Sequence, residues 1–136
     1  MSNKPIKTVL LIDDDDATNF LHKITIKHAD CAEYVHIAIN GLKALEYLTE
    51  AIEGKFPQPD LIFLDVNMPV MGGWEFLDAY EMLPKEQKAK MVLVMLTASL
   101  NPDDETKAKS YETVSGFKNK PLTIEMLHDI VKLHFS

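Results

Sequence analysis

The chain has 136 residues, 46% hydrophobic and 26% charged, which predicts one folded domain with a single core. Its net charge of -7 argues against a nucleic-acid-binding domain, because phosphate backbones need a basic face. The first residues lack a long apolar stretch, so we expect no secretion signal, and no apolar run approaches the roughly 20 residues that span a bilayer. The lone Cys31 excludes an internal disulfide or a cysteine metal cluster, and we expect a cytoplasmic protein without membrane partners.

The chain begins with an apolar run over residues 7–12, which predicts a buried strand. This run ends in four consecutive aspartates at 13–16. Helical spacing follows over 17–29, and Asp16 is the expected N-cap because its carboxylate can accept from the first helical amides. The residues expected to share one face of this helix are Phe20, Leu21, Ile24 and His28.

A second strand is predicted over 34–39, and Asn40 is the expected N-cap of a helix over 42–51. The inward side chains of that helix are predicted to be Leu42, Leu45 and Leu48. After a loop with two prolines, a third strand over 61–64 leads through Gly72 and Gly73 into a helix over 74–82. The packing residues expected there are Phe76, Leu77 and Tyr80.

Residues 91–96 are apolar at every position, which predicts a strand buried on both faces. A short polar helix over 102–110 and a fifth strand over 114–118 follow. The last helix is predicted over 123–133, with apolar residues at Ile124, Leu127, Ile130 and Val131. Because strands and helices alternate five times, we expect an α/β fold with a parallel sheet.

The ends of the predicted strands carry polar residues of complementary chemistry. In a parallel sheet the carboxyl ends meet at one edge, which would gather the aspartates at 13–16 with Asp65, Thr97 and Lys120. Clustered carboxylates repel unless a hard divalent cation lies between them, and a partial set of oxygen ligands suits Mg²⁺. Asp65 could then take a phosphoryl group covalently, while Lys120 binds phosphoryl oxygens and Thr97 donates a hydroxyl.

Each of these residues also has a plainer interpretation. The aspartate run could be a solvated, helix-capping segment, Thr97 a hydroxyl that merely ends a strand, and Lys120 a surface lysine. The five histidines have no tight metal-ligand spacing and are interpreted as surface or packing residues. The functional interpretation is favoured because acids, hydroxyl and lysine each fall at the end of a different strand.

Four motifs in order resemble a receiver domain of two-component signalling, similar to stand-alone chemotaxis regulators. The motifs are Leu11-Ile-Asp13-Asp14, Asp65-Val-Asn67-Met-Pro69 with Gly73 downstream, Leu96-Thr97-Ala98, and Lys120-Pro121. The resemblance covers nearly the whole chain. It implies a flavodoxin-like fold, in which a five-stranded parallel sheet of order 2-1-3-4-5 is doubly wound by five helices. It also implies that residues 1–136 form a single receiver domain without an output domain.

The resemblance further implies a phosphoacceptor switch. Asp65 would accept a phosphoryl group from a phosphohistidine on a histidine kinase or a histidine phosphotransfer protein. Mg²⁺ would be held by Asp13, Asp14, Asp65 and the backbone carbonyl of Asn67. Such a protein is no enzyme beyond its own phosphorylation and dephosphorylation. A downstream protein target would read the surface of the fourth helix, fifth strand and fifth helix.

Three further site properties follow from the same resemblance. Lys120 would bind the phosphoryl group, and its bond to Pro121 would be cis. Thr97 would move toward the phosphate and Phe117 would turn inward with it, relying on ring packing because Phe117 lacks the hydroxyl that many relatives carry at this place. The places of Asn67 and Ser99 tune the dephosphorylation rate in the family.

Three alternatives remain open at this stage. The four aspartates allow the metal-binding pair to be Asp14 and Asp15, although Asp13 and Asp14 directly follow the apolar strand. Asp14-Asp-Asp16-Ala-Thr18 also matches the nucleophile motif of haloacid-dehalogenase-type phosphohydrolases, with Asp14 as the nucleophile, but this leaves the motif at Asp65 without a role. A receiver-like module that is never phosphorylated is disfavoured by the complete set of acids, threonine and lysine.

Overall fold

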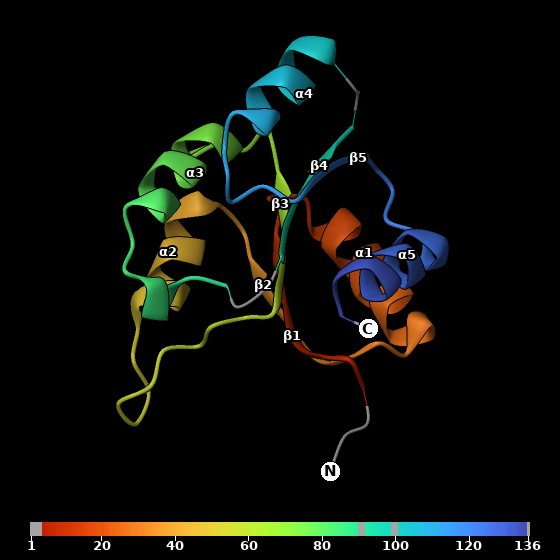
Figure 1. The fold of residues 1–136 in the computed structure, drawn as a ribbon, viewed down its shortest axis with the longest axis horizontal. Coiled ribbons are helices and arrows are strands. Elements are labelled where there is room, and N and C mark those ends of the chain that lie inside the picture. The colour runs from red at the N-terminus through yellow and green to blue at the C-terminus, as the bar shows by residue number, and fades with distance from the viewer. Residues whose placement is uncertain (1–3, 90–91, 99–100, 136) are drawn as a thin grey trace.

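A computed structural model describes residues 4–89, 92–98 and 101–135, and within them strands and helices alternate along the chain. Figure 1 shows a twisted sheet between two layers of helices. The strands are β1 (Ile6–Ile12), β2 (Ala32–Ala38), β3 (Leu61–Asp65), β4 (Val92–Thr97) and β5 (Gly116–Asn119). The α-helices are α1 (Asp16–Ala29), α2 (Gly41–Thr49), α3 (Gly73–Glu81), α4 (Pro102–Lys109) and α5 (Ile124–His134), and η1 (Lys85–Gln87) is a 3-10 helix.

The sheet has the predicted order β2-β1-β3-β4-β5, and all its neighbouring strands are parallel. The register places Leu10 opposite Ile62, and Ile62 opposite Leu93. The fifth strand begins at Gly116, two residues later than predicted, and Met91 of the predicted fourth strand lies outside the described residues. All carboxyl ends therefore lie at one edge of the sheet, as the alternation predicts.

Two apolar clusters fill the space between the sheet and its helices. Strand residues of alternating parity face opposite sides, so Val9, Leu11 and Phe63 pack with α1 and α5, whereas Leu10 and Ile62 pack with α2, α3 and α4. Figure 1 shows α2 and α3 on one side of the sheet and α1 and α5 on the other. β3 is buried at every position because helices cover both of its faces.

The predicted apolar face of α1 is wrong. Phe20 and Leu21 are 65% and 59% exposed, and Ile24 and His28 are exposed too. The residues that α1 buries are Asn19, His22 and Ile26. These three residues have the spacing expected for one face of a helix, but two of them are polar. A prediction from apolar periodicity therefore places the buried face on the wrong side of α1.

The helix caps confirm one prediction and correct another. Asn40 caps α2 by accepting from the Lys43 amide at 2.8 Å, as predicted. The N-cap of α1 is Asp15 instead of Asp16, because the Asp15 carboxylate accepts from the Ala17 amide at 3.0 Å and from the Thr18 hydroxyl at 2.9 Å. These bonds, with that of the Thr18 hydroxyl the largest contribution, lower the pKa of Asp15.

The buried faces of the other helices follow the predictions only in part. The expected Phe76, Leu77 and Tyr80 of α3 are all buried. In α2, Leu48 is buried and Leu45 is partly buried, but Leu42 is 44% exposed, and the small Ala44 faces the sheet. In α5, Leu127 and Ile130 are buried and Val131 is partly buried, whereas Ile124 is exposed. Within the described residues, no helix is both long and apolar enough to cross a membrane.

Candidate functional site

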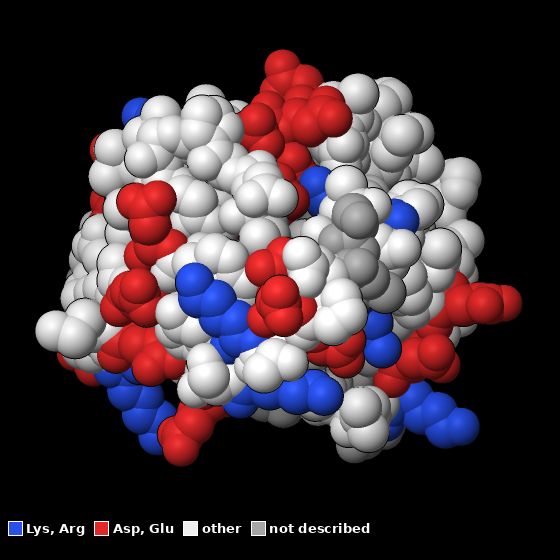
Figure 2. Space-filling view, turned by 90° about the horizontal axis from the view of Figure 1, so that it is seen from above, with Lys and Arg blue, Asp and Glu red and all other residues white. Residues whose placement is uncertain are grey.

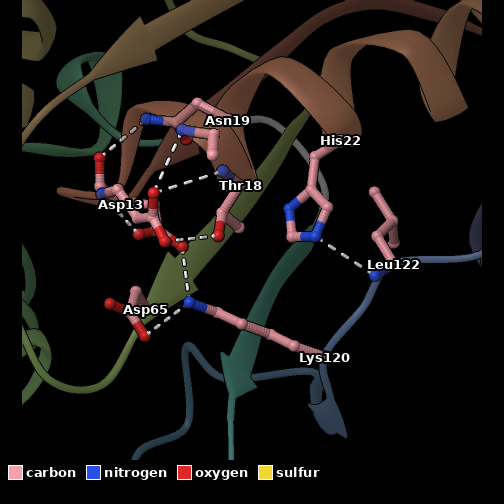
Figure 3. Close-up of polar contacts among 9 residues, drawn as sticks. Asp13, Thr18, Asn19, His22, Asp65, Lys120 and Leu122 are labelled. Carbon is pink, nitrogen blue, oxygen red and sulfur yellow. Dashed lines mark hydrogen bonds and ion pairs between the residues drawn. The ribbon is translucent and has the colours of Figure 1, made fainter.

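The carboxyl edge of the sheet brings together the four side chains that the strand ends predict. The Lys120 ammonium lies 2.6 Å from Asp13 Oδ2 and 3.1 Å from Asp65 Oδ1, so it bridges two strands (Figure 3). Asp13, Asp65 and Thr97 are buried, and the Lys120 side chain is largely so. The predicted convergence of the acids, the hydroxyl and the lysine is therefore what the fold produces.

Backbone contacts fix the position of the two buried carboxylates. The Asp13 amide donates to the Ala38 carbonyl at 3.1 Å, which extends the ladder of β1 and β2 to this residue. Asp65 ends β3, and the Gly73 amide donates to the Val66 carbonyl at 2.9 Å. A Cβ on Gly73 would lie 2.5 Å from the Asp65 carbonyl oxygen, so only glycine lets α3 begin this close to the strand end.

Thr97 and Lys120 lie beside each other at the ends of β4 and β5. The Lys120 amide donates to the Thr97 carbonyl at 2.7 Å, and Thr97 is opposite Asn119 in the register. The bond between Lys120 and Pro121 is cis, as the resemblance implies. Phe117 is partly buried on β5, where it lines a cavity of about 160 Å³ toward α5 and one of about 150 Å³ toward α4.

The site concentrates negative charge around one cation. Burial, and then repulsion from the Asp13 carboxylate, raises the pKa of Asp65 although Lys120 acts in the opposite direction. Burial alone would lower the pKa of Lys120, but hydrogen bonds and attraction from Asp13 and Asp65 outweigh it, so the pKa is raised. Lys120 is therefore a charged ammonium at neutral pH, and one positive charge faces several carboxylates.

Three carboxylates are placed to share a metal ion. Asp13, Asp14 and Asp65 each offer an oxygen, and these atoms lie within 4.8 Å of one another. An all-oxygen donor set of this charge suits a hard divalent cation. Asp15 uses its carboxylate to cap α1, which favours the pair Asp13 and Asp14 over Asp14 and Asp15. Asn67 is exposed in the loop two residues beyond Asp65, and Ser99 lies outside the described residues.

The molecular surface around this edge is open and charged. Figure 2, which looks down on the end of the molecule where α4 lies, shows acidic side chains in several groups with basic ones between them. A surface cavity of about 470 Å³ is lined by residues 66–69 and 72–75, next to Asp65 in the chain. The loop between β3 and α3 therefore borders a solvent-filled hollow that begins one residue after Asp65.

Two buried polar residues that bond to the site loops escape the sequence analysis. His22, interpreted as a surface or packing residue, is buried, and its Nε2 accepts from the Leu122 amide at 3.2 Å. Asn19 is buried as well, and its Nδ2 donates to the Asp13 carbonyl at 2.8 Å (Figure 3). In the sequence, the only sign of their burial is that Asn19 and His22 are spaced with Ile26 as on one face of a helix. A search for apolar residues at helical spacing does not find such a mixed face.

An aromatic contact joins α3 to the segment that follows α4. The rings of Trp74 and Tyr111 are stacked with centroids 6.1 Å apart, and the Lys107 ammonium lies 4.8 Å from the Trp74 ring centre. The Tyr111 hydroxyl donates to the Asp78 carboxylate at 2.7 Å, and this bond raises the pKa of Tyr111 to about 12. Trp74 directly follows Gly73, so the contact begins where α3 meets the end of β3.

A family model, described as the response regulator receiver domain, matches residues 9–132. The chain belongs to this family. Its members are phosphoacceptor switches of two-component signalling that receive phosphoryl groups from histidine kinases. The comparisons give no support to the phosphohydrolase alternative, and Asp16 of that motif is an exposed residue in the first turn of α1.

Relatives and solved structures agree with this assignment. Response regulator Rcp1 of Synechocystis is 31% identical over 105 residues, which cover 75% of this chain and 69% of Rcp1. A two-component response regulator from Cytophaga hutchinsonii is 32% identical, with a TM-score of 0.82 over 94% of this chain and 96% of that one. The Mn²⁺-bound form of Rcp1 is 28% identical, with a TM-score of 0.73 over 93% and 92%.

Several relatives are longer proteins in which the match covers one part. The chain spans 44% of the nitrate/nitrite regulator NarL of Escherichia coli, at 36% identity. It spans 18% of a protein-glutamate methylesterase of Burkholderia thailandensis, at 40% identity over 70 residues. It also spans 7% of hybrid signal transduction histidine kinase B of Dictyostelium discoideum, at 30% identity over 146 aligned positions. Receiver domains therefore occur in this family beside enzymes.

Proposed function

We propose that Asp65 is the phosphoacceptor of this receiver and that it takes its phosphoryl group from a phosphohistidine on a histidine kinase or a histidine phosphotransfer protein. The observation that carries this proposal is the Lys120 ammonium between the carboxylates of Asp13 and Asp65, at distances of 2.6 and 3.1 Å. Asp65 ends a buried central strand next to a surface cavity. Its carboxylate is therefore fixed by the strand and partly desolvated.

In the proposed reaction, an Asp65 carboxylate oxygen attacks the phosphorus of the phosphohistidine. The new O–P bond forms as the N–P bond breaks, and the electron pair of that bond stays on the imidazole nitrogen of the donor. Lys120 binds an oxygen of the transferred group, whose negative charge attracts the ammonium away from Asp13. Thr97, buried at the end of β4, donates its hydroxyl to another oxygen.

The resident cation is proposed to be Mg²⁺, bound by Asp13, Asp14, Asp65 and the backbone carbonyl of Asn67. When bound, it neutralises charge on the phosphoryl oxygens and on the clustered carboxylates. The raised pKa of Asp65, caused by burial and by neighbouring carboxylates, supports a site that accepts a cation. That the relative Rcp1 has a Mn²⁺-bound form supports a divalent metal as the ligand of this receiver.

We further propose that phosphorylation is read on the face formed by α4, β5 and α5. Movement of Thr97 would let Phe117, which lies between two cavities on that face, turn inward and change the surface offered to a downstream protein. The switch is a shift between existing states, driven by the difference in binding energy of the phosphoryl group between them. The chain is proposed to catalyse only its own phosphorylation and dephosphorylation, in the cytoplasm.

The direct test mixes the protein with Mg²⁺ and a small phosphodonor and follows its intact mass. We expect wild type to gain the mass of one phosphoryl group and Asp65→Asn to gain none. Asp16→Asn is the matched control, because Asp16 lies in the same acidic run but outside the metal group, and it should gain mass like wild type. No gain in wild type, or an undiminished gain in Asp65→Asn, would contradict the assignment.

A further inference from the structure

We propose that Asn19 and His22 are positioning residues for phosphoryl transfer. Each fixes one of the two loops that carry the ion pair next to Asp65, and both belong to the same turn of α1. This inference rests on the proposed function, because it concerns how the chain places Lys120 and Asp13 for that reaction. Neither residue touches the reacting atoms, so both act through the groups that they hold.

His22 holds the loop that carries Lys120. Its Nε2 accepts a hydrogen bond from the Leu122 amide at 3.2 Å, and both residues are buried. On the other side of the loop, the Lys120 amide is bonded to the Thr97 carbonyl at 2.7 Å. The backbone is therefore fixed at Lys120 itself and two residues beyond it. This matters because the flexible Lys120 side chain can contact both carboxylates only if its backbone is correctly placed.

Asn19 holds the end of β1 in the corresponding way. Its Nδ2 donates to the Asp13 carbonyl at 2.8 Å. Its Oδ1 is buried and has no hydrogen-bond partner among the residues that the structure describes. Burying a polar atom without a partner is unfavourable, so an apolar side chain would suit packing better at this position. The bond to Asp13 is the feature that accounts for an amide here.

The two bonds share one rigid frame. Residues three apart on a helix lie on the same face, so Asn19 and His22 reach the two loops from one turn of α1. Asp13 and Lys120 are 107 residues apart in the chain. The backbone at or near each of them is nevertheless hydrogen-bonded to the same turn of α1. Small displacements of groups around a reacting centre lower rates strongly, so this frame should be visible in the kinetics.

The first experiment compares His22→Leu with His22→Gln. Leucine cannot accept the Leu122 hydrogen bond, whereas the glutamine oxygen can. With saturating Mg²⁺ and a small phosphodonor, we expect His22→Leu to acquire the phosphoryl group about tenfold more slowly than wild type, and His22→Gln to stay within about threefold. Wild-type speed in His22→Leu, or equal slowing in both variants, would overturn the proposal for His22.

Ile26→Ala is the matched control for lost stability. Ile26 is buried on the same face of α1 but belongs to the apolar cluster beneath the site. We expect this variant to lower the melting temperature at least as much as His22→Leu while phosphorylation stays within about threefold of wild type. Comparable slowing in Ile26→Ala would show that any weakening of α1 slows the reaction, and would overturn the positioning role.

For Asn19, the change is Asn19→Leu and the readout is the dissociation constant of Mg²⁺, measured by calorimetry without phosphodonor. Release of the Asp13 backbone should weaken cation binding by about tenfold. In His22→Leu the same constant should change by less than about threefold, because its bond restrains the lysine loop and not the metal ligands. Unchanged Mg²⁺ affinity in Asn19→Leu would overturn the role of Asn19.

A measurement on wild type does not depend on how the variants fold. Nitrogen NMR of His22 should show an Nε2 without a proton and a scalar coupling to the Leu122 amide across the hydrogen bond. A protonated Nε2, or absence of the coupling, would overturn the inference. Failure of wild type to take up phosphoryl would contradict the proposed function instead, and the NMR and calorimetric readouts would still decide this inference.

Discussion

At the residue scale, Lys120 has two partners whose charges it offsets. Its ammonium contacts Asp13 and Asp65 at the end of different strands, and all three side chains are largely buried. Removing one partner of a buried ion pair leaves the other charges uncompensated, which costs more than the pair contributes. Removal of the Lys120 charge is therefore expected to destabilise the fold as well as to impair the proposed reaction.

This predicts that Lys120→Met lowers the free energy of unfolding by about 3 kcal/mol in cation-free buffer, because two buried carboxylates lose their counter-charge. Mg²⁺ should restore part of the loss, since it supplies positive charge at the same oxygens. Urea unfolding with and without Mg²⁺ measures both effects. Lys43→Met is the control, because the exposed pair of Lys43 with Glu46 should be worth less than about 1 kcal/mol. A loss that Mg²⁺ leaves unchanged would contradict the prediction.

Tyr111 gives the stability of the protein a dependence on alkaline pH. Its hydrogen bond to Asp78 raises its pKa to about 12, whereas an unfolded chain releases the proton near pH 10. The folded state thus binds more protons between these values, so the contribution is full below about pH 10 and falls as pH rises toward 12. Unfolding of wild type and Tyr111→Phe across this range should show a stability difference that shrinks with pH. A constant difference would contradict the prediction.

At the element scale, the start of α3 depends on how closely it approaches β3. A Cβ on Gly73 would meet the Asp65 carbonyl oxygen at 2.5 Å and the Val66 Cα at 2.9 Å, both backbone atoms that cannot turn aside. A Cβ on Gly72 would find its nearest neighbour at 3.6 Å, an ordinary contact. A side chain could therefore be accommodated at Gly72 but not at Gly73.

We expect Gly73→Ala to destabilise the protein by about 1–3 kcal/mol, because α3 must shift away from the end of β3. It should also slow phosphorylation, because the shift would displace the backbone of Asp65, whose carboxylate is the proposed phosphoacceptor. Gly72→Ala should change stability by no more than about 0.5 kcal/mol. Thermal unfolding and the mass assay measure these effects, and equal behaviour of the two variants would argue against the close contact.

The elements themselves could be predicted from the sequence because strand and helix signals agree at each step. Residues 61–64 and 91–96 are apolar throughout, which is typical of strands covered by helices on both faces. The face of α1 could not be predicted, because the stripe that packs inward contains Asn19 and His22, whose hydrogen bonds to distant loops leave no local trace. The cap at Asp15 was missed because four identical residues give no reason to choose among them.

At the scale of the whole molecule, the site joins residues from four strand ends that are far apart in sequence. Their convergence was predictable because parallel topology alone sends every carboxyl end to one edge. The switch movements of Thr97 and Phe117 and the metal-binding role of Asn67 came from the resemblance and remain predictions. A cation bound among the strand ends would bind the folded chain only, since the unfolded chain separates its ligands.

Mg²⁺ should therefore stabilise the entire fold. At a concentration of one hundred times its dissociation constant, a ligand of the folded state adds about 2.7 kcal/mol to the free energy of unfolding. Wild type should show this rise in urea unfolding and lose it with a chelator, and Asp14→Asn should show little of it. Asp16→Asn should respond like wild type. A rise of equal size in Asp14→Asn would indicate that Mg²⁺ binds elsewhere.

Trp74 is the sole tryptophan in the sequence, and its ring contacts Tyr111 and Lys107, so its surroundings depend on the relative positions of α3 and α4. Indole emission responds to a neighbouring ammonium and to the polarity around it. The protein consequently carries a built-in optical reporter one residue away from Gly73, whose amide donates to the carbonyl of Val66, the residue after Asp65. Turnover of the acyl phosphate could be followed in a cuvette, in real time and without any attached dye.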